Sequence, residues 1–515
     1  MPRSIRFPTW ALPLAAALSL GIAAPARAAG NVVIGLDATI LGLDPADLND
    51  NLSMTATRTM LQGLYGFDKD MKMIPVLAES YEANAAATEY VVHLRHGISF
   101  HDGAPFDATA VKTSFDRARD PANHLKRASL YAPIDHVDVV DPFTVKIVLK
   151  YPFGAFVNNL AHAAFEIMSP KAIAQYGKEV DRHPSGTGPY MFVSLQPDAL
   201  KVVKNPNYWK PGLPKIDSLT IRNIPESGSR LAMLQTGEAQ YIFPLPVEMA
   251  AAIEHSPTLD VISAKSIYVR YVALNNMRKP FDDLRVREAM NYAVDKQAFA
   301  KVVFNGYAIP LDSPLPANLS SYVSQGTPWP YDPAKAKALL AEAGYPNGFK
   351  SVLWGNNTSL TQKAMQFLQQ QFAQVGVTVE VEPLEAGVLA SKIWNVSTPE
   401  DATTMMHYSG WSASTGDADW GLRPLLGGPD AFPPKLFNTA YYSSPQVNAD
   451  IKAGLETADA AKRAAAYKDA QAVIWKDAPW VFLASDYNLS AKSKKLSGIY
   501  VLPDGQMLTE DAALN

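Results

Sequence analysis

Hydrophobic and polar residues alternate along this chain with two different periods. Short runs dominated by apolar residues, such as 32–36 and 267–275, predict strands. The stretch 283–304 has apolar residues three and four positions apart, with Gly306 just beyond its end, and predicts one long amphipathic helix. Strands that alternate with helices are typical of an open α/β sheet, whose ligands lie beyond the carboxyl ends of strands.

The other expected elements begin and end at recognisable residues. Asp107 is expected to cap a helix over 107–118, and Gly237 to end a helix over 229–236. Further helices are predicted over 52–64, 333–343, 360–375 and 460–475. Further strands are predicted over 90–94, 137–149 (split by a turn), 241–243 and 377–381.

The segment 405–423, MMHYSGWSASTGDADWGLR, is the strongest candidate for a binding loop. A strand is expected to end at Gly410, and the loop beyond it places Asp417 and Asp419 between Trp411 and Trp420. Indole rings exclude water, and carboxylates orient a small polar molecule, an ammonium group above all. Tyr408, Ser412 and Trp411 are proposed as wall and hydrogen-bond donors, and a surface turn with solvated acids is the alternative.

The first 28 residues have the pattern of a secretory signal peptide. Arg3 and Arg6 precede an apolar stretch over 10–24, and Ala26-Arg27-Ala28 fits a cleavage site. We therefore expect export and a mature chain from Ala29, with an uncleaved anchor as the alternative. Removal of three arginines would leave 43 basic and 50 acidic residues, a net charge of −7, which disfavours nucleic acid as a partner.

Composition and motifs argue against several chemistries. The chain has no cysteine, which excludes disulfides, thiolate metal sites and a cysteine nucleophile. His93, His96 and His101 lack the spacing of a metal site, although they keep a nickel or haem ligand as an alternative. No catalytic or phosphate-binding motif is present. The basic cluster Lys112, Arg117, Arg119, Lys126 and Arg127 is interpreted as a solvated face. We therefore expect that the protein binds no metal or cofactor and is not an enzyme. An exported peptide hydrolase is the alternative.

A series of motifs in order along the chain resembles the solute-binding proteins of ABC importers, in their dipeptide/oligopeptide/nickel class. They are LAESY (77–81), LRHGISFHDGAPFDATAVKTSFDRA (94–118), GTGPY (186–190), NPNYW (205–209), FDDLRVREAMNYAVDK (281–296), AEAGYPNGF (341–349) and SDYNLSA (485–491). The resemblance implies a two-lobed α/β periplasmic binding protein fold (type II) with an extra subdomain in its first lobe. It also implies a monomer in the periplasm that closes over its ligand by a hinge motion and docks on an inner-membrane permease.

The same resemblance gives the expected domains. The first lobe comprises 29–72, 186–264 and 493–515, with the extra subdomain at 73–185, and the second lobe comprises 265–492.

A second set of motifs is similar to the glutathione-binding branch of that class. It includes ARDPANHLKR (118–127), YWKPGLPKIDS (208–218), AMLQTGEAQ (232–240), PWPYDP (328–333), GWSASTGDADW (410–420) and LFNTA (436–440). Glutathione is therefore the expected ligand, with a dipeptide or oligopeptide as the alternative.

Glutathione has two carboxylates and one ammonium group, so its site should offer at least one guanidinium and one carboxylate. Arg270, on the strand that opens the second lobe, is the main candidate for a ligand carboxylate, and a structural ion pair is its alternative role. Peptide binders of the class have an aspartate three residues after the loop tryptophan, where this chain has Ser414. The amine anchor is therefore expected at Asp417 or Asp419, and a group elsewhere in the chain is the alternative. Asn49 and Asp50 are further cleft candidates, with turn capping as the alternative.

Overall fold

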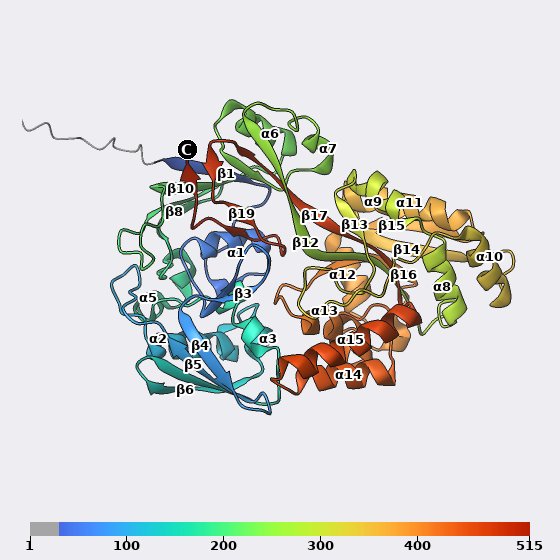
Figure 1. Ribbon diagram of the computed structural model, residues 1–515, viewed down its shortest axis with the longest axis horizontal. Helices are drawn as coiled ribbons and strands as arrows, with labels where there is room; N and C mark the ends of the chain where they lie inside the picture. Colours follow the sequence, from blue (N-terminus) through green and yellow to red (C-terminus); the bar gives the residue numbers. More distant parts are fainter. Residues whose placement is uncertain (1–29) are drawn as a thin grey trace, which may run out of the picture.

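The computed structural model describes residues 30–515, so the predicted signal peptide lies outside the described residues. Two large parts lie on either side of two long strands that run diagonally between them (Figure 1). These strands are β12 (Leu259–Leu274) and β17 (Trp480–Ser493), which pair antiparallel over nearly their whole length. No helix within 30–515 is long and apolar enough to cross a membrane.

One sheet of eleven strands passes through both parts. Its order is β15-β14-β16-β12-β17-β11-β1-β10-β9-β8, with β13 paired to β17. The remaining strands of this sheet are β1 (Asn31–Leu36), β8 (Tyr190–Gln196), β9 (Ala199–Lys204), β10 (Ser218–Asn223), β11 (Tyr241–Phe243), β13 (Ala308–Pro310), β14 (Lys350–Asn356), β15 (Thr378–Leu384) and β16 (Met406–Ser412). The lobe boundaries expected at 264/265 and 492/493 fall inside β12 and β17, and the division into domains stays a prediction.

A separate four-stranded sheet, β4-β5-β7-β6, lies within the predicted extra subdomain. The strands are β4 (Ala78–Ala83), β5 (Glu89–Leu94), β6 (Ile134–Asp141) and β7 (Thr144–Leu149). Buried residues alternate along β5 and β7, as expected when one face of a sheet covers a core. Short hairpin strands complete the fold: β2 (Tyr65–Phe67), β3 (Met73–Pro75), β18 (Leu496–Ser497), β19 (Tyr500–Val501), β20 (Met507–Leu508) and β21 (Ala513–Leu514).

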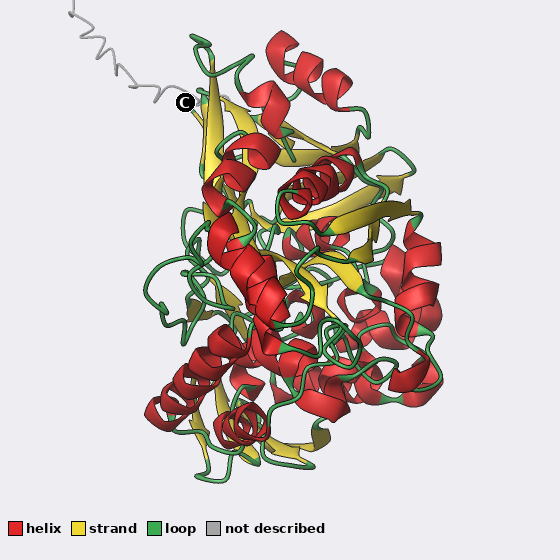
Figure 2. Cartoon of the chain, turned by 90° about the vertical axis from the view of Figure 1, so that its right-hand side faces the viewer, coloured by secondary structure: helices red, strands yellow, loops and turns green. Residues whose placement is uncertain are grey.

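Helices lie on both sides of the large sheet (Figure 2). They are α1 (Asn51–Arg58), α2 (Ala108–Arg119), α3 (Ala128–Tyr131), α4 (Phe156–Asn159), α5 (Pro170–Tyr176), α6 (Ser227–Thr236), α7 (Val247–Ala250), α8 (Leu284–Tyr292), α9 (Lys296–Phe304), α10 (Pro333–Glu342), α11 (Ser359–Ala373), α12 (Ala386–Trp394), α13 (Ala418–Leu426), α14 (Pro445–Leu455) and α15 (Ala460–Asp477). Asp107 caps α2 and Gly237 ends α6, as the sequence predicts.

Two predicted helices are shorter than expected. The segment 283–304 forms α8 and α9, because Asp295 is extended and its carboxylate accepts from the N–H of Ala298, which starts a new helix. The helix predicted over 52–64 ends at Arg58. The carbonyl groups of Thr59 and Met60 instead accept from Tyr190 and Gly188 in the neighbouring segment.

The strand expected to end at Gly410 continues to Ser412. Gly410 pairs with Arg270 inside the sheet, and the ring of Tyr268 lies over it. A Cβ atom on Gly410 would approach that ring to 2.0 Å. The glycine therefore makes room for an aromatic ring on the neighbouring strand and does not break the strand.

Candidate ligand-binding site

A cavity of about 530 Å³ lies between the predicted extra subdomain (73–185) and the predicted second lobe (265–492). The subdomain and the loop after β1 form one wall, and α13, the segment 435–437 and the end of α14 form the other. The lining residues are Asn49, Lys126, Arg127, Ser129, Leu130, Pro133, Tyr151, Phe153, Asn159, Trp420, Arg423, Lys435, Leu436, Phe437 and Leu455. This volume is typical of small-molecule sites.

The charge of the lining is one-sided. Its charged residues are four cations, Lys126 and Arg127 on one wall and Arg423 and Lys435 on the other, and no carboxylate is among the described residues that line it. Three of these cations also pair with acids outside the lining: Lys126 with Asp47, Arg423 with Asp419 and Lys435 with Asp430. The surface that faces the cavity is nevertheless cationic on both walls, which favours a ligand with negative groups.

Arg127 presents part of its guanidinium to the cavity. Its Nε donates to the carbonyl oxygen of Leu48 at 2.6 Å, and its two terminal nitrogens have no hydrogen-bonding partner among residues 30–515. Partial burial lowers the pKa of Arg127, and the nearby Asp50 carboxylate opposes that shift. A half-buried guanidinium has lost water, so it gains more from a ligand carboxylate than an exposed one does.

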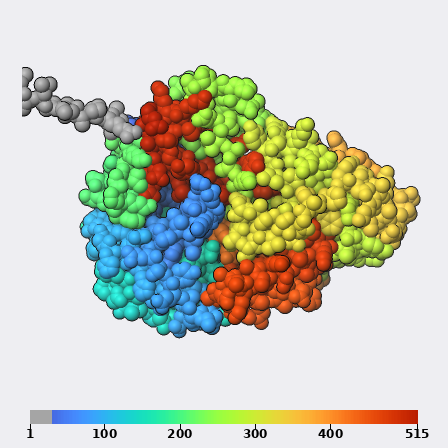
Figure 3. Space-filling view, viewed as in Figure 1, coloured from blue at the N-terminus to red at the C-terminus, as the bar shows by residue number. Residues whose placement is uncertain are grey.

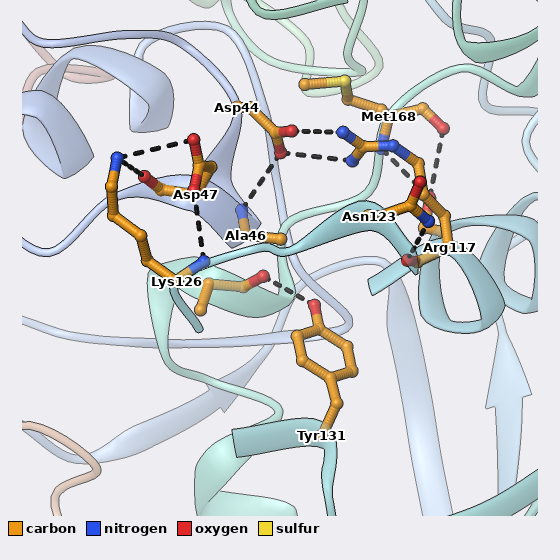
Figure 4. Close-up of polar contacts among 10 residues, drawn as sticks. Asp44, Ala46, Asp47, Arg117, Asn123, Lys126, Tyr131 and Met168 are labelled. Atoms are coloured by element: carbon orange, nitrogen blue, oxygen red, sulfur yellow. Dashed lines mark hydrogen bonds and ion pairs between the residues drawn. The ribbon is translucent and has the colours of Figure 1, made fainter. Parts of the chain in front are cut away.

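The wall around Arg127 is held in place by ion pairs that the loop after β1 makes with α2 and with the segment that follows α2 (Figure 4). Asp44 accepts from Arg117, with one contact at 3.2 Å, and also caps the turn at Ala46. Asp47 accepts from the main-chain N–H of Lys126 at 3.1 Å and pairs with its ammonium at 3.4 Å. Arg117 is therefore structural, and the interpretation of the whole basic cluster as a solvated face is wrong for Arg117 and Arg127.

The opposite wall begins at the predicted binding loop. Asp417 caps α13 and binds the buried Arg463, whose Nη2 lies 2.7 Å from each carboxylate oxygen. Burial raises the pKa of Asp417, and the positive charge of Arg463 opposes that shift. Asp419, which is 2% exposed, accepts from Arg423 at 2.8–3.1 Å. The two aspartates therefore already hold arginines of this chain, and through Asp419 they fix Arg423 at the cavity.

Some aromatic residues of this region line the cavity, and others pack behind the lining residues. Trp420 and Phe437 line the cavity. Trp411 packs behind them, with ring centroids 5.8 Å from Trp420 and 5.1 Å from Phe437, and its Nε1 donates to the carbonyl of Trp420 at 2.7 Å.

Three predicted site residues, Arg270, Tyr408 and Ser412, belong to the other face of the large sheet. Successive residues of a strand point to opposite faces. Val269 and Tyr271 of β12 pack into the core that also takes Trp411. Val272 of β12 and its partner Tyr408 of β16 pack into the core around α8 and α9. Arg270 shares the face of Val272, and its guanidinium lies 5.8 Å from the ring of Phe304 on α9. The structure therefore does not bring these three together with Asp417 and Asp419.

On that face Arg270 forms an ion pair with Asp486, with contacts of 2.8 and 3.2 Å. Its guanidinium also lies 4.2 Å from the ring centroid of Tyr268. The hydroxyl groups of Tyr408 and Ser412 are buried without a hydrogen-bonding partner among the described residues. This geometry is that of the structural ion pair, the alternative that the sequence left open.

Of the other predicted residues, Asn49 lines the cavity and Asp50 caps α1 by accepting from the N–H of Ser53 at 2.7 Å. The second carboxylate oxygen of Asp50 is buried without a partner among residues 30–515. The sequence reasoning missed Arg127, Arg423, Tyr151, Phe153 and Phe437. Signals were available, since Arg127 ends the motif ARDPANHLKR, Arg423 ends the segment 405–423 and Phe437 lies in LFNTA. Within 30–515, no cluster of three or more His, Cys, Asp or Glu residues could hold a metal ion.

Comparison with known proteins identifies the family to which this chain belongs. The family model of bacterial extracellular solute-binding proteins, family 5, matches residues 72–433. This chain belongs to that family. A glutathione-binding protein GsiB of Pectobacterium atrosepticum is 51% identical over 96% of both chains, and one of Escherichia coli is 47% identical over 98% of both.

Solved structures agree on the two-lobed periplasmic binding protein fold. HbpA2 from Haemophilus parasuis superposes with a TM-score of 0.84, at 25% identity over 94% of this chain and 100% of that one. An ABC transporter-associated periplasmic binding protein, DppA from Helicobacter pylori in complex with the peptide STSA, gives 0.75 at 28% identity over 93% and 96%. The expected family and fold class are therefore confirmed.

Proposed function

We propose that this protein is the periplasmic glutathione-binding component of an ABC importer, and that glutathione occupies the cavity between the extra subdomain and the second lobe. Relatives named as glutathione-binding proteins match nearly the whole chain at about half identity. The observation that carries the proposal is the pair of guanidinium groups, Arg127 and Arg423, on opposite walls of one cavity.

The ligand chemistry fits that pair. Glutathione ends in a carboxylate at both ends, whereas an ordinary dipeptide has only one. A dicarboxylate can bind Arg127 on one wall and Arg423 on the other, so it holds the two walls together and favours the closed form. Trp420, Phe437 and Tyr151 supply apolar surface for the methylene and thiol groups between the ends.

The ammonium group of glutathione lies beside one of its carboxylates. Among the acids behind the lining are Asp419, which holds Arg423, and Asp50, which influences Arg127. We propose Asn49 and these acids as the polar surroundings of the ammonium group. Asp417, Trp411, Tyr408, Ser412 and Arg270 act by supporting the walls or the sheet.

Binding and delivery, without bond making or breaking, follow from the family and complete the proposal. We propose a monomer that is exported through a cleaved signal peptide and presents its ligand to an inner-membrane permease. An exported peptide hydrolase would instead release products from glutathione or a dipeptide, which chromatography of an overnight incubation would reveal.

The test is calorimetric titration with reduced glutathione, oxidised glutathione, glutathione monoethyl ester and the dipeptide Met-Leu. The ester keeps every group of glutathione except one carboxylate charge, so it should bind ~10–100-fold more weakly, as for a lost charge-assisted hydrogen bond. At a concentration ~100 times its dissociation constant, glutathione should also stabilise the fold by ~2.7 kcal/mol. Binding of Met-Leu without binding of glutathione would favour the dipeptide alternative and contradict the proposal.

A further inference from the structure

The two walls of the cavity meet at one main-chain contact beside its rim. A loop of the extra subdomain, residues 151–154 and here called the closing loop, reaches the turn between α14 and α15, residues 456–459. Along this line the orange surface of α14 and α15 adjoins the blue and cyan N-terminal surface (Figure 3). Tyr151 and Phe153 of the closing loop and Leu455 at the end of α14 all line the cavity.

The closing loop is held firmly by its own lobe. The main-chain N–H of Phe153 donates to the carbonyl of Ala87 at 2.9 Å, and the hydroxyl of Tyr90 donates to the carbonyl of Phe153 at 2.7 Å. Phe153 itself is 4% exposed. Because both main-chain groups of Phe153 are satisfied inside the subdomain, the loop can approach the other lobe only by movement of the subdomain as a whole.

Gly154, the next residue, makes the contact across the cleft. Its N–H donates to the carbonyl of Leu455 at 2.6 Å. Leu455 is the last residue of α14, and the final carbonyl groups of a helix have no partner within the helix. The bond therefore joins a donor and an acceptor from opposite walls of the cavity, and separation of the two walls would break it.

Only glycine fits at position 154. A Cβ atom there would lie 1.9 Å from the carbonyl oxygen of Thr457 and 3.0 Å from Nη1 of Arg463. The first obstacle is main chain, and the second cannot move aside easily because Nη2 of Arg463 is fixed by both oxygens of Asp417. Any side chain at 154 would keep the two lobes apart.

This inference rests on glutathione capture as the function. We propose that Gly154 is a positioning residue for capture. Its contact with the α14–α15 turn, here called the joint, is where the two walls meet when the cavity closes. The buried pair of Asp417 and Arg463 has a role in this joint, because it fixes the surface on which the closing loop rests. The guanidinium of Arg423 lies 5.8 Å from the ring of Phe153, so the joint and the ligand-facing cation are adjacent.

The test compares Gly154→Ala with Gly42→Ala, the same chemical change in the first lobe, where the nearest atoms to the new Cβ lie at 3.7 and 3.9 Å. Gly154→Ala should weaken glutathione binding by ~10-fold or more, since the closed form becomes less accessible, and Gly42→Ala should leave it within ~2-fold. Both unliganded variants should melt close to wild type.

A distance measurement separates failed closure from a local binding defect. The chain has no cysteine, so Val140→Cys on β6 and Lys452→Cys on α14 can carry paired spin labels at exposed positions. With saturating glutathione, wild type and Gly42→Ala should give one short distance, whereas Gly154→Ala should keep a longer one. Equal affinity and an equal distance for Gly154→Ala would overturn the proposal.

Amide hydrogen exchange tests the joint without a variant at position 154. Ligand should slow exchange of the Gly154 amide in the wild-type protein by ~10-fold or more, because the hydrogen bond to Leu455 forms in the closed state. Unchanged exchange on ligand binding would overturn the proposal even if Gly154→Ala did not fold. If the wild-type protein did not bind glutathione, the proposed ligand would be wrong. The same exchange and distance measurements with a bound dipeptide would then still decide the role of Gly154.

Discussion

Two arginine-containing regions lie on opposite faces of the same sheet, and their arginines have different surroundings. On the face toward α8 and α9, Arg270 is neutralised by Asp486 and stacked beside Tyr268. On the other side, Arg127 lines a cavity, and its one hydrogen-bonding partner in the described part of the chain is the carbonyl of Leu48, on Nε. Arg423, across the cavity, is held by Asp419 from behind. A carboxylate partner alone does not separate the two regions, because Asp419 binds Arg423 through Nε and Nη2 just as Asp486 binds Arg270. The difference is that Arg127 and Arg423 also line the cavity, whereas Arg270 does not.

The strongest test of this contrast is Arg270→Ala. It would leave the carboxylate of Asp486 poorly solvated and unpaired, so the free energy of unfolding should fall by ~3 kcal/mol. Urea unfolding monitored by tryptophan fluorescence measures that loss. Glutathione affinity of the folded variant should stay near wild type. Loss of glutathione binding with an unchanged free energy of unfolding would show that Arg270 binds the ligand.

The converse test is Arg127→Ala, with its neighbour Lys126→Ala as the matched control. Removal of Arg127 should weaken glutathione binding by ~10–100-fold, because a partly desolvated guanidinium bonded to a carboxylate contributes ~1.5–3 kcal/mol. Lys126 is exposed and pairs with Asp47, so its loss should matter less. Calorimetric titration of both variants measures the two losses of glutathione affinity. Equal losses would mean that the general positive charge of the cavity, and not Arg127 in particular, binds the ligand.

A smaller effect is expected from Tyr408→Phe on the Arg270 face. The hydroxyl of Tyr408 is buried without a partner among the described residues, so its removal should be neutral or stabilise the fold by up to ~1 kcal/mol. Thermal unfolding measures this change. Weaker glutathione binding by this variant would show that the face contributes to capture.

The smallest effect is expected from Asn49→Ala at the rim of the cavity. Asn49 is exposed and neutral, so loss of its side-chain hydrogen bonds should reduce glutathione affinity only ~2–5-fold, by ~0.5–1 kcal/mol. Titration calorimetry resolves such a change. A loss as large as that of Arg127→Ala would move the centre of the site to the loop after β1.

Sequence reasoning gave the fold well, because apolar periodicity, Asp107 as a cap and Gly237 as a stop are local signals. It was wrong at Gly410, where the deciding feature is the ring of Tyr268 on another strand. The site was harder for the same reason. The loop 410–420 was a good guide to the region, but partners distant in sequence decide the roles: Arg463 for Asp417, and Asp486 for Arg270. The face on which Tyr408 points depends on strand register, which the sequence does not show on its own.

The most direct measurement is a crystal structure of the protein grown with glutathione. We predict ligand density in the cavity, with one carboxylate on the terminal nitrogens of Arg127, the other beside Arg423, and the Gly154–Leu455 hydrogen bond intact. Ligand density against Arg270 and Asp486, or a cavity that stays empty at a concentration that saturates binding in solution, would contradict the account.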